Sequence, residues 1–245
     1  MTKHAVSVSD LQYPYHDKRV WKAVLSFIKD LKPEIVILNG DGHDFYDMSS
    51  HSRNPERCGK LAVEIAGFND DVLGPLVKAA PKAKRYYMEG NHERRFTRYI
   101  WHQAPALSGF NGLKHAGQAL GVAKHGFEYR AENEHLELGH LLVLHGHLIS
   151  RHSGWTARQH FMRYGTSLLV GHSHRWGSFA VRDWRGCHIA EEQGCLCDLA
   201  PEYDPHPNWQ QGFAVVTLDK DEFDVRVVRV VNRAFFYWGS ERYEI

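Results

Sequence analysis

The stretch IVILNGDGHD, residues 35–44, joins an apolar run to a loop of glycine, aspartate and histidine. The run 35–38 is entirely aliphatic and bounded by polar residues, which is typical of a buried strand. Gly40-Asp41-Gly42-His43-Asp44 is too polar to continue such a strand. The stretch therefore predicts a strand that ends in a loop bearing Asp41 and Asp44.

The same order of an apolar run and a polar motif recurs along the chain. Three motifs follow the apolar runs 5–8, 141–144 and 168–170, and another follows the mixed run 85–88. In chain order these motifs are Asp10-Leu11-Gln12, Gly90-Asn91-His92-Glu93, His145-Gly146-His147 and Gly171-His172-Ser173-His174. Ligands of open α/β sheets gather outside the carboxyl ends of the strands, so we expect these motifs to converge. Asp, Asn and His in this number can hold two metal ions side by side.

The remaining sequence indicates how these strands are connected. Apolar residues at helical spacing predict a helix over 20–31 and a second one over 61–76, which Gly74-Pro75 should interrupt. In the C-terminal half, strands are expected at 134–138, 141–144, 167–170, 178–183, 187–191, 212–218 and 224–231. Helices early and strands late predict an α/β fold of two mixed β-sheets packed face to face with helices on the outside. We expect one domain spanning 1–245.

Composition narrows the class of protein. The 245 residues are 43% hydrophobic, enough for one large core, and 30 basic against 29 acidic residues leave a formal charge of +1. This balance gives the chain as a whole no electrostatic signature of nucleic-acid or membrane binding. Its apolar runs are far shorter than the roughly 18 residues of a membrane span, and no signal-peptide core follows Met1. We expect a cytoplasmic protein with no membrane contact; the sequence does not indicate its oligomeric state.

Four cysteines lack the paired spacing of a structural zinc site, and all four are expected to be reduced. They are Cys58, Cys187, Cys195 and Cys197. The close pair Cys195 and Cys197 is either two buried thiols on alternate residues of a strand, which we favour, or a pair of metal ligands.

The ordered motifs resemble those of the calcineurin-like metallophosphoesterase superfamily, and the resemblance runs over 6–174. The superfamily pattern is Asp-x-His, Gly-Asp-x-x-Asp, Gly-Asn-His followed by Glu or Asp, a later His-Gly, and Gly-His-x-His. Four of the five motifs match in full, which is far more specific than any one alone. The resemblance implies the four-layer αββα metallophosphoesterase fold and the hydrolysis of phosphoester bonds.

The resemblance also implies a site for two divalent metal ions, Mn²⁺ foremost, with Mg²⁺, Zn²⁺, Fe or Ni²⁺ as alternatives. The implied ligands are Asp10, Asp41 and His174 for the first ion, and Asp41, Asn91, His145 and His172 for the second. The bridging Asp41 suits its role because a carboxylate offers two oxygens and offsets part of the repulsion between the cations. A hydroxide held by such a pair of ions is the expected nucleophile.

Two further residues take catalytic parts in this resemblance. His92 would stand beside the leaving group without ligating a metal, and Asp44 would hold its ring. A carboxylate next to imidazole fixes the ring and raises its pKa, which suits a proton donor to a leaving alkoxide.

Gln12 departs from the pattern, because the superfamily usually has a metal-binding histidine there. Glutamine offers a neutral amide oxygen, a harder and generally weaker ligand. Either Gln12 ligates and favours Mn²⁺ or Mg²⁺, or a water replaces the imidazole, or the first position is weakly filled. We favour a working but more labile first position.

Other residues near the motifs are candidates for substrate binding. Arg94 and Arg95 could clamp a phosphate, or lie on a solvated helix face and pair with Glu93 and other acids. His147 either lines the pocket or is a solvated loop residue. The segment 151–163, which contains Trp155, could stack a base and hold a phosphate, or its aromatic residues belong to the core.

The function we expect first is a phosphodiesterase acting on nucleotides or nucleic acid. One alternative is a phosphomonoesterase or protein phosphatase. Phe45, directly after Asp44, disfavours a protein phosphatase, since those enzymes typically carry an arginine at this position. Another is a metal-binding scaffold without turnover because of Gln12. Loops at 104–126 and after Gly194, the second with Trp209, are expected to shape specificity.

Overall fold

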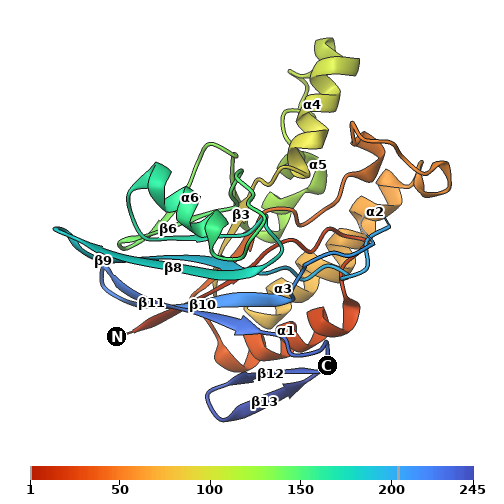
Figure 1. Ribbon diagram of the computed structural model, residues 1–245. Helices are drawn as coiled ribbons and strands as arrows, with labels where there is room; N and C mark the ends of the chain where they lie inside the picture. The colour runs from red at the N-terminus through yellow and green to blue at the C-terminus, as the bar shows by residue number, and fades with distance from the viewer. Residues whose placement is uncertain (1, 203–204) are drawn as a thin grey trace.

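The structure is a computed structural model that describes residues 2–202 and 205–245 (Figure 1). Its first sheet has six strands in the order β11-β10-β1-β2-β3-β4. Their bounds are β1 (Lys3–Val8), β2 (Ile35–Asn39), β3 (Lys84–Met88), β4 (Phe127–Arg130), β10 (Gly212–Asp219) and β11 (Glu222–Arg229). Strands β1 to β4 are parallel, whereas β10 is antiparallel to β1 and β11 to β10.

The second sheet has five strands in the order β5-β6-β7-β9-β8. Their bounds are β5 (Leu136–Leu138), β6 (Leu141–Leu144), β7 (Leu168–Val170), β8 (Trp176–Asp183) and β9 (Gly186–Gln193). Strands β6, β7 and β9 are parallel neighbours, and β5 and β8 form antiparallel edges. Both sheets are therefore mixed, as the sequence predicted.

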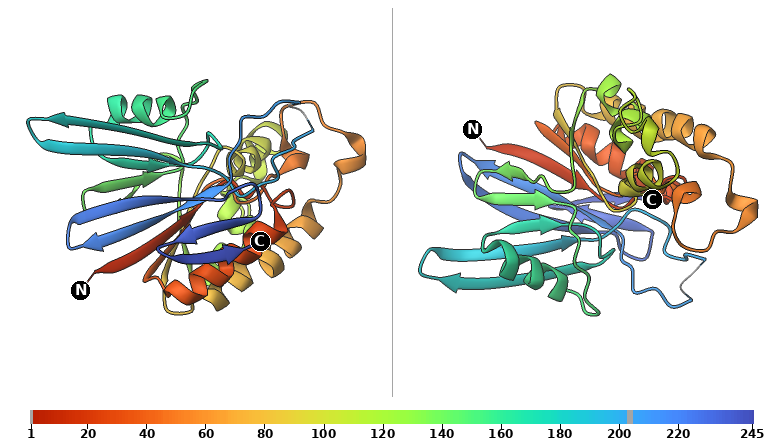
Figure 2. Two further views of the ribbon diagram at one scale, coloured as in Figure 1. Left: turned by 60° about the horizontal axis from the view of Figure 1, so that its bottom comes forward. Right: turned by 90° about the horizontal axis from the view of Figure 1, so that it is seen from above.

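Helices cover the outer face of each sheet (Figure 2). Over the first sheet lie α1 (Lys18–Leu31), α2 (Leu61–Phe68), α3 (Gly74–Ala79), α4 (Glu93–Gln103) and α5 (Ala116–Leu120); over the second lies α6 (Trp155–Tyr164). Short turns of 3-10 helix are η1 (Tyr46–Met48), η2 (Pro55–Arg57), η4 (Pro105–Leu107) and η5 (Val122–His125), and η3 (Asn69–Leu73) is a π-helical turn. None of the helices in the described residues is long and apolar enough to cross a membrane.

Three apolar clusters separate these layers. Alternate residues of β2 show how: Val36 and Leu38 pack under the helices, whereas Ile37 packs between the sheets against Val143 and Leu169. A third cluster joins α6 to the second sheet. The predicted fold, two mixed sheets face to face with helices outside, is confirmed.

The helix ends agree with the local sequence. Asp17 caps α1 by accepting hydrogen bonds from the N–H groups of Arg19 and Val20. The expected interruption at Gly74-Pro75 is present, because α2 gives way to η3 and α3 starts at Gly74. The features that the sequence did not predict include β4, the helices α5 and α6, and the C-terminal hairpin of β12 (Phe235–Trp238) and β13 (Glu241–Glu244).

Helix α6 is fixed by two buried polar side chains. Glu192 of β9 accepts hydrogen bonds from the N–H groups of Gly154 and Ala157 at 2.7 and 3.2 Å, and from the Ser173 hydroxyl at 2.5 Å. His160, on the inner face of α6, is fully buried; Nδ1 donates to the Thr156 carbonyl at 2.9 Å and Nε2 accepts from the His147 N–H at 3.2 Å. This pattern requires a neutral ring, and burial lowers the pKa of His160 from 6.5 to about 4.

The lowered pKa of His160 predicts acid sensitivity. The folded state prefers the neutral ring, so the stabilisation is fully present above pH 6.5 and is lost as the pH falls from 6.5 toward about 4. Between about pH 7.5 and about pH 5, the free energy of unfolding of metal-free wild-type protein should fall by about 2 kcal/mol more than that of His160→Gln. Urea titrations at both pH values measure this. His102→Gln, at an exposed position, should follow the wild type; equal losses in all three proteins would contradict the role of His160.

Candidate metal centre

Five loops from the two sheets meet at one edge of the sandwich. The loops after β1, β2 and β3 bring Asp10, Asp41 and Asn91, and those after β6 and β7 bring His145 and His172. Backbone hydrogen bonds join neighbouring loops, from Asp10 N to Gly40 O at 3.1 Å and from Gly171 N to His145 O at 2.9 Å. The convergence that the sequence predicted is therefore present.

The backbone is strained at this edge. Candidate ligands Asp10, Gln12, Asp41, His172 and His174 all have φ between 49 and 66°, in the left-handed region that non-glycine residues rarely adopt. Each such residue costs of order 1 kcal/mol or more, and such strain persists where the surroundings enforce it, typically at functional sites. Glycine permits the close approach of the loops, since a Cβ at Gly90 would collide with the Asp41 carboxylate.

Asp10, Asp41 and His174 form the first group of candidate ligands. All three are buried, and one ligand atom from each lies within 4.8 Å of the others. Asp10 Oδ2 accepts hydrogen bonds from the Ser9 hydroxyl at 2.5 Å and from His172 N at 3.0 Å. Asp10 Oδ1 accepts none from the described residues and faces His174 Nε2 at 3.1 Å.

Asp41, His145 and His172 form the second group, again within 4.8 Å of one another. His145 Nδ1 donates to the Asn39 carbonyl at 2.7 Å, which directs Nε2 toward Asp41 Oδ2 at 3.3 Å and Asn91 Oδ1 at 3.4 Å. Such a bond on the far nitrogen fixes the tautomer of a metal-binding histidine. Asp41 is shared by both groups, as a bridging ligand would be.

The charges of this edge fit a cation. Two carboxylates are fully or almost fully buried, at 0% exposure for Asp10 and 1% for Asp41, which is costly without positive charge nearby. Burial opposes ionisation of Asp41, but His145 and His92 together outweigh it and hold its pKa well below the usual range. Burial likewise lowers the pKa of His145, yet Asp41 raises it overall to about 10. Protonated imidazole thus occupies the electrostatic role that a metal ion would take, so metal uptake must release protons.

Gln12 lies beside the first group. Its amide nitrogen is 3.2 Å from His174 Nε2 and 3.5 Å from His92 Nε2, and the residue is 7% exposed. The nitrogen and oxygen of such an amide are interchangeable in assignment, so the terminal group of Gln12 can present its oxygen to a cation at this place. The departure from the superfamily pattern leaves a side chain that reaches the first position.

His92 and Asp44 form a hydrogen-bonded pair next to the candidate metal ligands. His92 Nδ1 is 2.7 Å from Asp44 Oδ1, and His92 N donates to Asp41 Oδ1 at 2.8 Å. Arg95 completes the pair: it binds the Asp44 carboxylate, and its Nη2 lies 3.1 Å from His92 Nε2. A guanidinium only donates hydrogen bonds, so Nε2 is the acceptor and Nδ1 carries the proton.

Glu93 has a role that sequence analysis did not predict. Its Oε2 accepts from the N–H groups of Asp41 and Gly90, both at 2.9 Å, and its Oε1 accepts from His43 N at 3.1 Å and the Tyr87 hydroxyl at 2.7 Å. The interpretation of Glu93 as a partner on a solvated helix face is wrong, because the residue is 0% exposed. The only signal in the sequence is that Glu93 directly follows Asn91-His92.

The remaining predicted residues lie at the rim. Arg94 pairs with Glu132, whereas Arg95 contacts the pair of His92 and Asp44. His147 is exposed and its ring packs edge to face on His160 at 5.3 Å. The loop after Gly194 does approach the ligands, since the Trp209 ring lies 4.3 Å from that of His174. Part of this loop, 203–204, lies outside the described residues.

The thiols of Cys195 and Cys197 are buried, as predicted, and contact the back of the first group. Cys197 Sγ is 3.9 Å from His174 Nδ1, so His174 faces Asp10 with one ring nitrogen and the thiols with the other. The two thiols and His174 also lie within 4.8 Å of one another. All four cysteines are free.

Comparisons with known proteins add to this geometry. No protein-family model matches the chain. Two curated proteins, each named Gene 54 protein, align over 248 residues and 96% of both chains: that of Mycobacterium phage L5 is 28% identical and that of Mycobacterium phage D29 is 29% identical. Neither name states an activity.

Solved structures resemble the chain in fold. Vps29 complexed with Zn²⁺ from Entamoeba histolytica has a TM-score of 0.47 at 12% identity over 98% of both chains. Purple acid phosphatase PPD1 from yellow lupin (Lupinus luteus) has a TM-score of 0.52 at 14% identity, covering 94% of this chain and 52% of that one. The chain has the metallophosphoesterase fold. Within that fold its clustered Asp and His residues are placed where they could bind metal.

Glu93→Gln should loosen the loops of this metallophosphoesterase fold. The two oxygens of the Glu93 carboxylate each accept two hydrogen bonds. The NH₂ group of a glutamine would replace one oxygen and face two hydrogen-bond donors. We expect a loss of about 3 kcal/mol in the free energy of unfolding. Tyr87→Phe, which removes one donor, should cost about 1 kcal/mol. Urea titrations measure both, with exposed Glu222→Gln as the matched control; a stable Glu93→Gln would refute the role of Glu93.

Gln12→His should tighten the first metal position. The wild-type chain is expected to bind two Mn²⁺ ions in two steps, the weaker at Asp10, Gln12 and His174. Imidazole is generally the stronger ligand, so Gln12→His should lower the weaker Kd by about tenfold, or about 1.4 kcal/mol, and leave the tighter one unchanged. Calorimetric titration of chelator-stripped protein measures both steps. One ion per chain at saturating Mn²⁺ would instead indicate that the first position is lost.

Proposed function

We propose that this chain is a metal-dependent phosphodiesterase that acts on nucleotides or nucleic acid with two divalent cations. The observation that carries the proposal is the shared Asp41: it belongs to both ligand groups and also receives the His92 N–H. Two cations bound there would activate a water molecule and hold the phosphoryl oxygens of an in-line displacement. The candidate ligands are Asp10, Gln12, Asp41, Asn91, His145, His172 and His174, with Mn²⁺ as the favoured metal.

His92 and Asp44 would act on the leaving oxygen. His92 Nε2 lies 3.7 Å from Asp41 Oδ2 and so points toward the ligand cluster, while Asp44 holds the opposite nitrogen. His92 can donate a proton to the leaving oxygen only if Nε2 carries a hydrogen. The hydrogen bond from Arg95 to Nε2 must then break. A bound substrate would favour this change, because its phosphate offers the Arg95 guanidinium two or more acceptor oxygens.

Arg95 also supports a second candidate function, a phosphomonoesterase. Phe45, where protein phosphatases typically carry an arginine, is fully buried and cannot hold a phosphate. The guanidinium of Arg95 nevertheless lies against Asp44 and His92 from the side of α4. A terminal phosphate carries one more ionisable oxygen than a diester, and such a guanidinium would favour it.

Turnover of two small esters separates these functions. Chelator-stripped protein is given Mn²⁺, Mg²⁺, Zn²⁺ or Ni²⁺ and assayed on bis-p-nitrophenyl phosphate and p-nitrophenyl phosphate. We expect metal-dependent cleavage of the diester, no turnover by Asp41→Asn, and a kcat about 100-fold lower for His92→Ala with metal binding retained. His102→Ala, exposed at the end of α4, is the matched histidine control.

Each other outcome has a definite meaning. Preference for the monoester would favour the phosphomonoesterase. An unchanged rate in His92→Ala would remove His92 from the mechanism. No turnover of either ester with any metal would indicate a metal-binding scaffold with a disabled first position.

A further inference from the structure

The acidic residues of this chain are unevenly distributed. The 45 residues 138–182 contain no Asp or Glu, although the whole chain has 29, and they contain five arginines and seven histidines. Although the formal charge of the whole chain is only +1, all charged side chains of this long segment are basic. This segment forms β6, α6, β7 and nearly all of β8, which is the side of the molecule that α6 covers.

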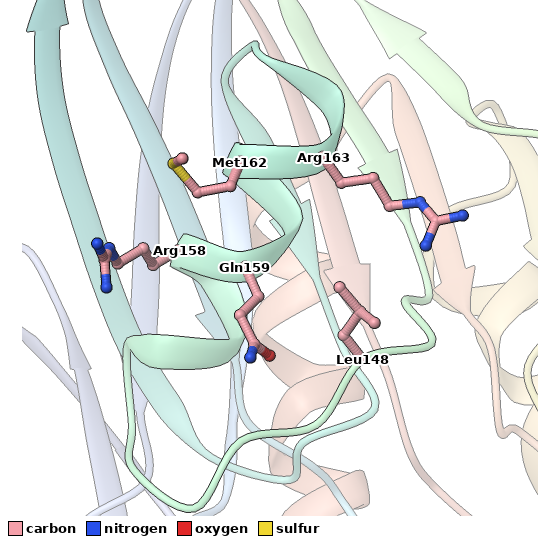
Figure 3. Close-up of a pocket in the computed structure, with 5 residues that line it drawn as sticks. All are labelled: Leu148, Arg158, Gln159, Met162 and Arg163. Carbon is pink, nitrogen blue, oxygen red and sulfur yellow. The ribbon is translucent and has the colours of Figure 1, made fainter.

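The outer face of α6 combines cations with exposed apolar groups. Trp155 is 54% exposed, Met162 is 70% exposed, and the Arg158 guanidinium lies 5.8 Å from the centre of the Trp155 ring. An open groove of about 510 Å³ runs beside them (Figure 3), and its lining residues are Leu148, Arg158, Gln159, Met162 and Arg163. In this view the two arginines extend from opposite sides of the helix, with Leu148 facing it from the preceding loop.

This groove lies next to the candidate metal centre. His147 follows His145 by two residues, and its N–H binds His160 of α6. Gly146 lies between α6 and the loop after β7, because a Cβ there would be 3.2 Å from His160 Nε2 and 3.7 Å from His172 Cβ. Leu148, the residue after His147, lines the groove together with Arg163.

Carboxylates on the neighbouring strands already have partners. Glu192 is buried under α6 and binds Gly154, Ala157 and Ser173. Three others lie in the same sheet and are each bonded: Glu191 to Ser178, Asp183 to Arg185 and His188, and Glu137 to His135. Among residues 2–202 and 205–245, no carboxylate forms a salt bridge with Arg158 or Arg163, so both guanidinium groups are available to a ligand outside the protein.

We propose that this groove binds single-stranded nucleic acid and guides it to the metal centre, an inference that rests on the proposed phosphodiesterase function. Arg158 and Arg163 contact backbone phosphates, and Trp155 with Met162 offers an apolar surface on which unpaired bases stack. The bound nucleic acid continues past His147 to the candidate ligands His145 and His172. A duplex fits less well, because its bases are already stacked on one another and present only their edges.

Binding of a labelled dT12 oligonucleotide tests the proposal. Fluorescence anisotropy is measured with the full-length chain in EDTA, which prevents cleavage, at several salt concentrations. We expect Trp155→Ala to weaken binding about tenfold. Arg158→Gln with Arg163→Gln should make the slope of log K against log salt shallower by about 1.4, or about 0.7 for each lost phosphate contact.

The matched control lies on α4, which packs on the first sheet, whereas α6 packs on the second. Trp101→Ala with Arg98→Gln removes the same residue types from exposed positions of α4, and it should leave binding unchanged. Equal weakening in the α6 and α4 variants would overturn the proposal, as would a wild-type chain that binds duplex as tightly as dT12. All these positions are exposed, so thermal unfolding should show unchanged stability.

The small-ester assay separates this inference from the function on which it rests. The triple variant of Trp155, Arg158 and Arg163 should cleave bis-p-nitrophenyl phosphate at the wild-type rate, because that substrate is too small to reach the groove. Ester turnover without dT12 binding would refute the groove alone. Binding of dT12 without ester turnover would refute the phosphodiesterase and leave a nucleic-acid-binding surface.

Discussion

The candidate metal centre depends on the seam between the two sheets. The candidate oxygen ligands come from loops of the first sheet, namely Asp10, Gln12, Asp41 and Asn91. The candidate nitrogen ligands come from loops of the second sheet, namely His145, His172 and His174. A cation at either position would therefore tie the sheets together. The apolar cluster between the two sheets, which includes Ile37, Val143 and Leu169, must hold the sheets in one relative position for the candidate ligands to meet. Metal binding and sheet packing should stabilise each other, because a ligand that binds only the folded state favours it.

Two buried carboxylates brace this seam from either side. Glu93 gathers the loops after β2 and β3 through three backbone N–H groups, and Glu192 joins the start of α6 to the loop after β7. Both act on loops whose backbone is strained, at Asp41 in one case and at His172 and His174 in the other. Hydrogen bonds to a charged acceptor are worth about 1.5 to 3 kcal/mol each, enough to offset that strain. The edge is thus held in shape by carboxylates that do not themselves reach the metal positions.

The sequence was sufficient for the features that depend on local pattern. Each apolar run followed by a polar motif was a strand ending at the same edge, and the break at Gly74-Pro75 followed from the missing N–H of proline. What it could not supply was set by contacts distant in the chain. The hairpin β12-β13 forms because Phe236 and Tyr243 pack on Phe27 of α1, some 200 residues earlier. Glu93 looked like a solvated residue because only the fold shows that its side chain turns inward to Asp41 and Gly90.

The effect of Gln12 can be separated into charge and occupancy. The candidate ligands carry negative charge only at Asp10 and Asp41, so two divalent cations would leave the centre with a net positive charge. Replacing a neutral imidazole by a neutral amide does not alter that balance, and a bound phosphate would meet the same field in either case. What changes is the strength of one donor at the first position, where His174 and Asp10 remain in place. Gln12 should therefore govern how often the first position is filled, and a centre with both cations bound should attract an anionic substrate as strongly as one with histidine there.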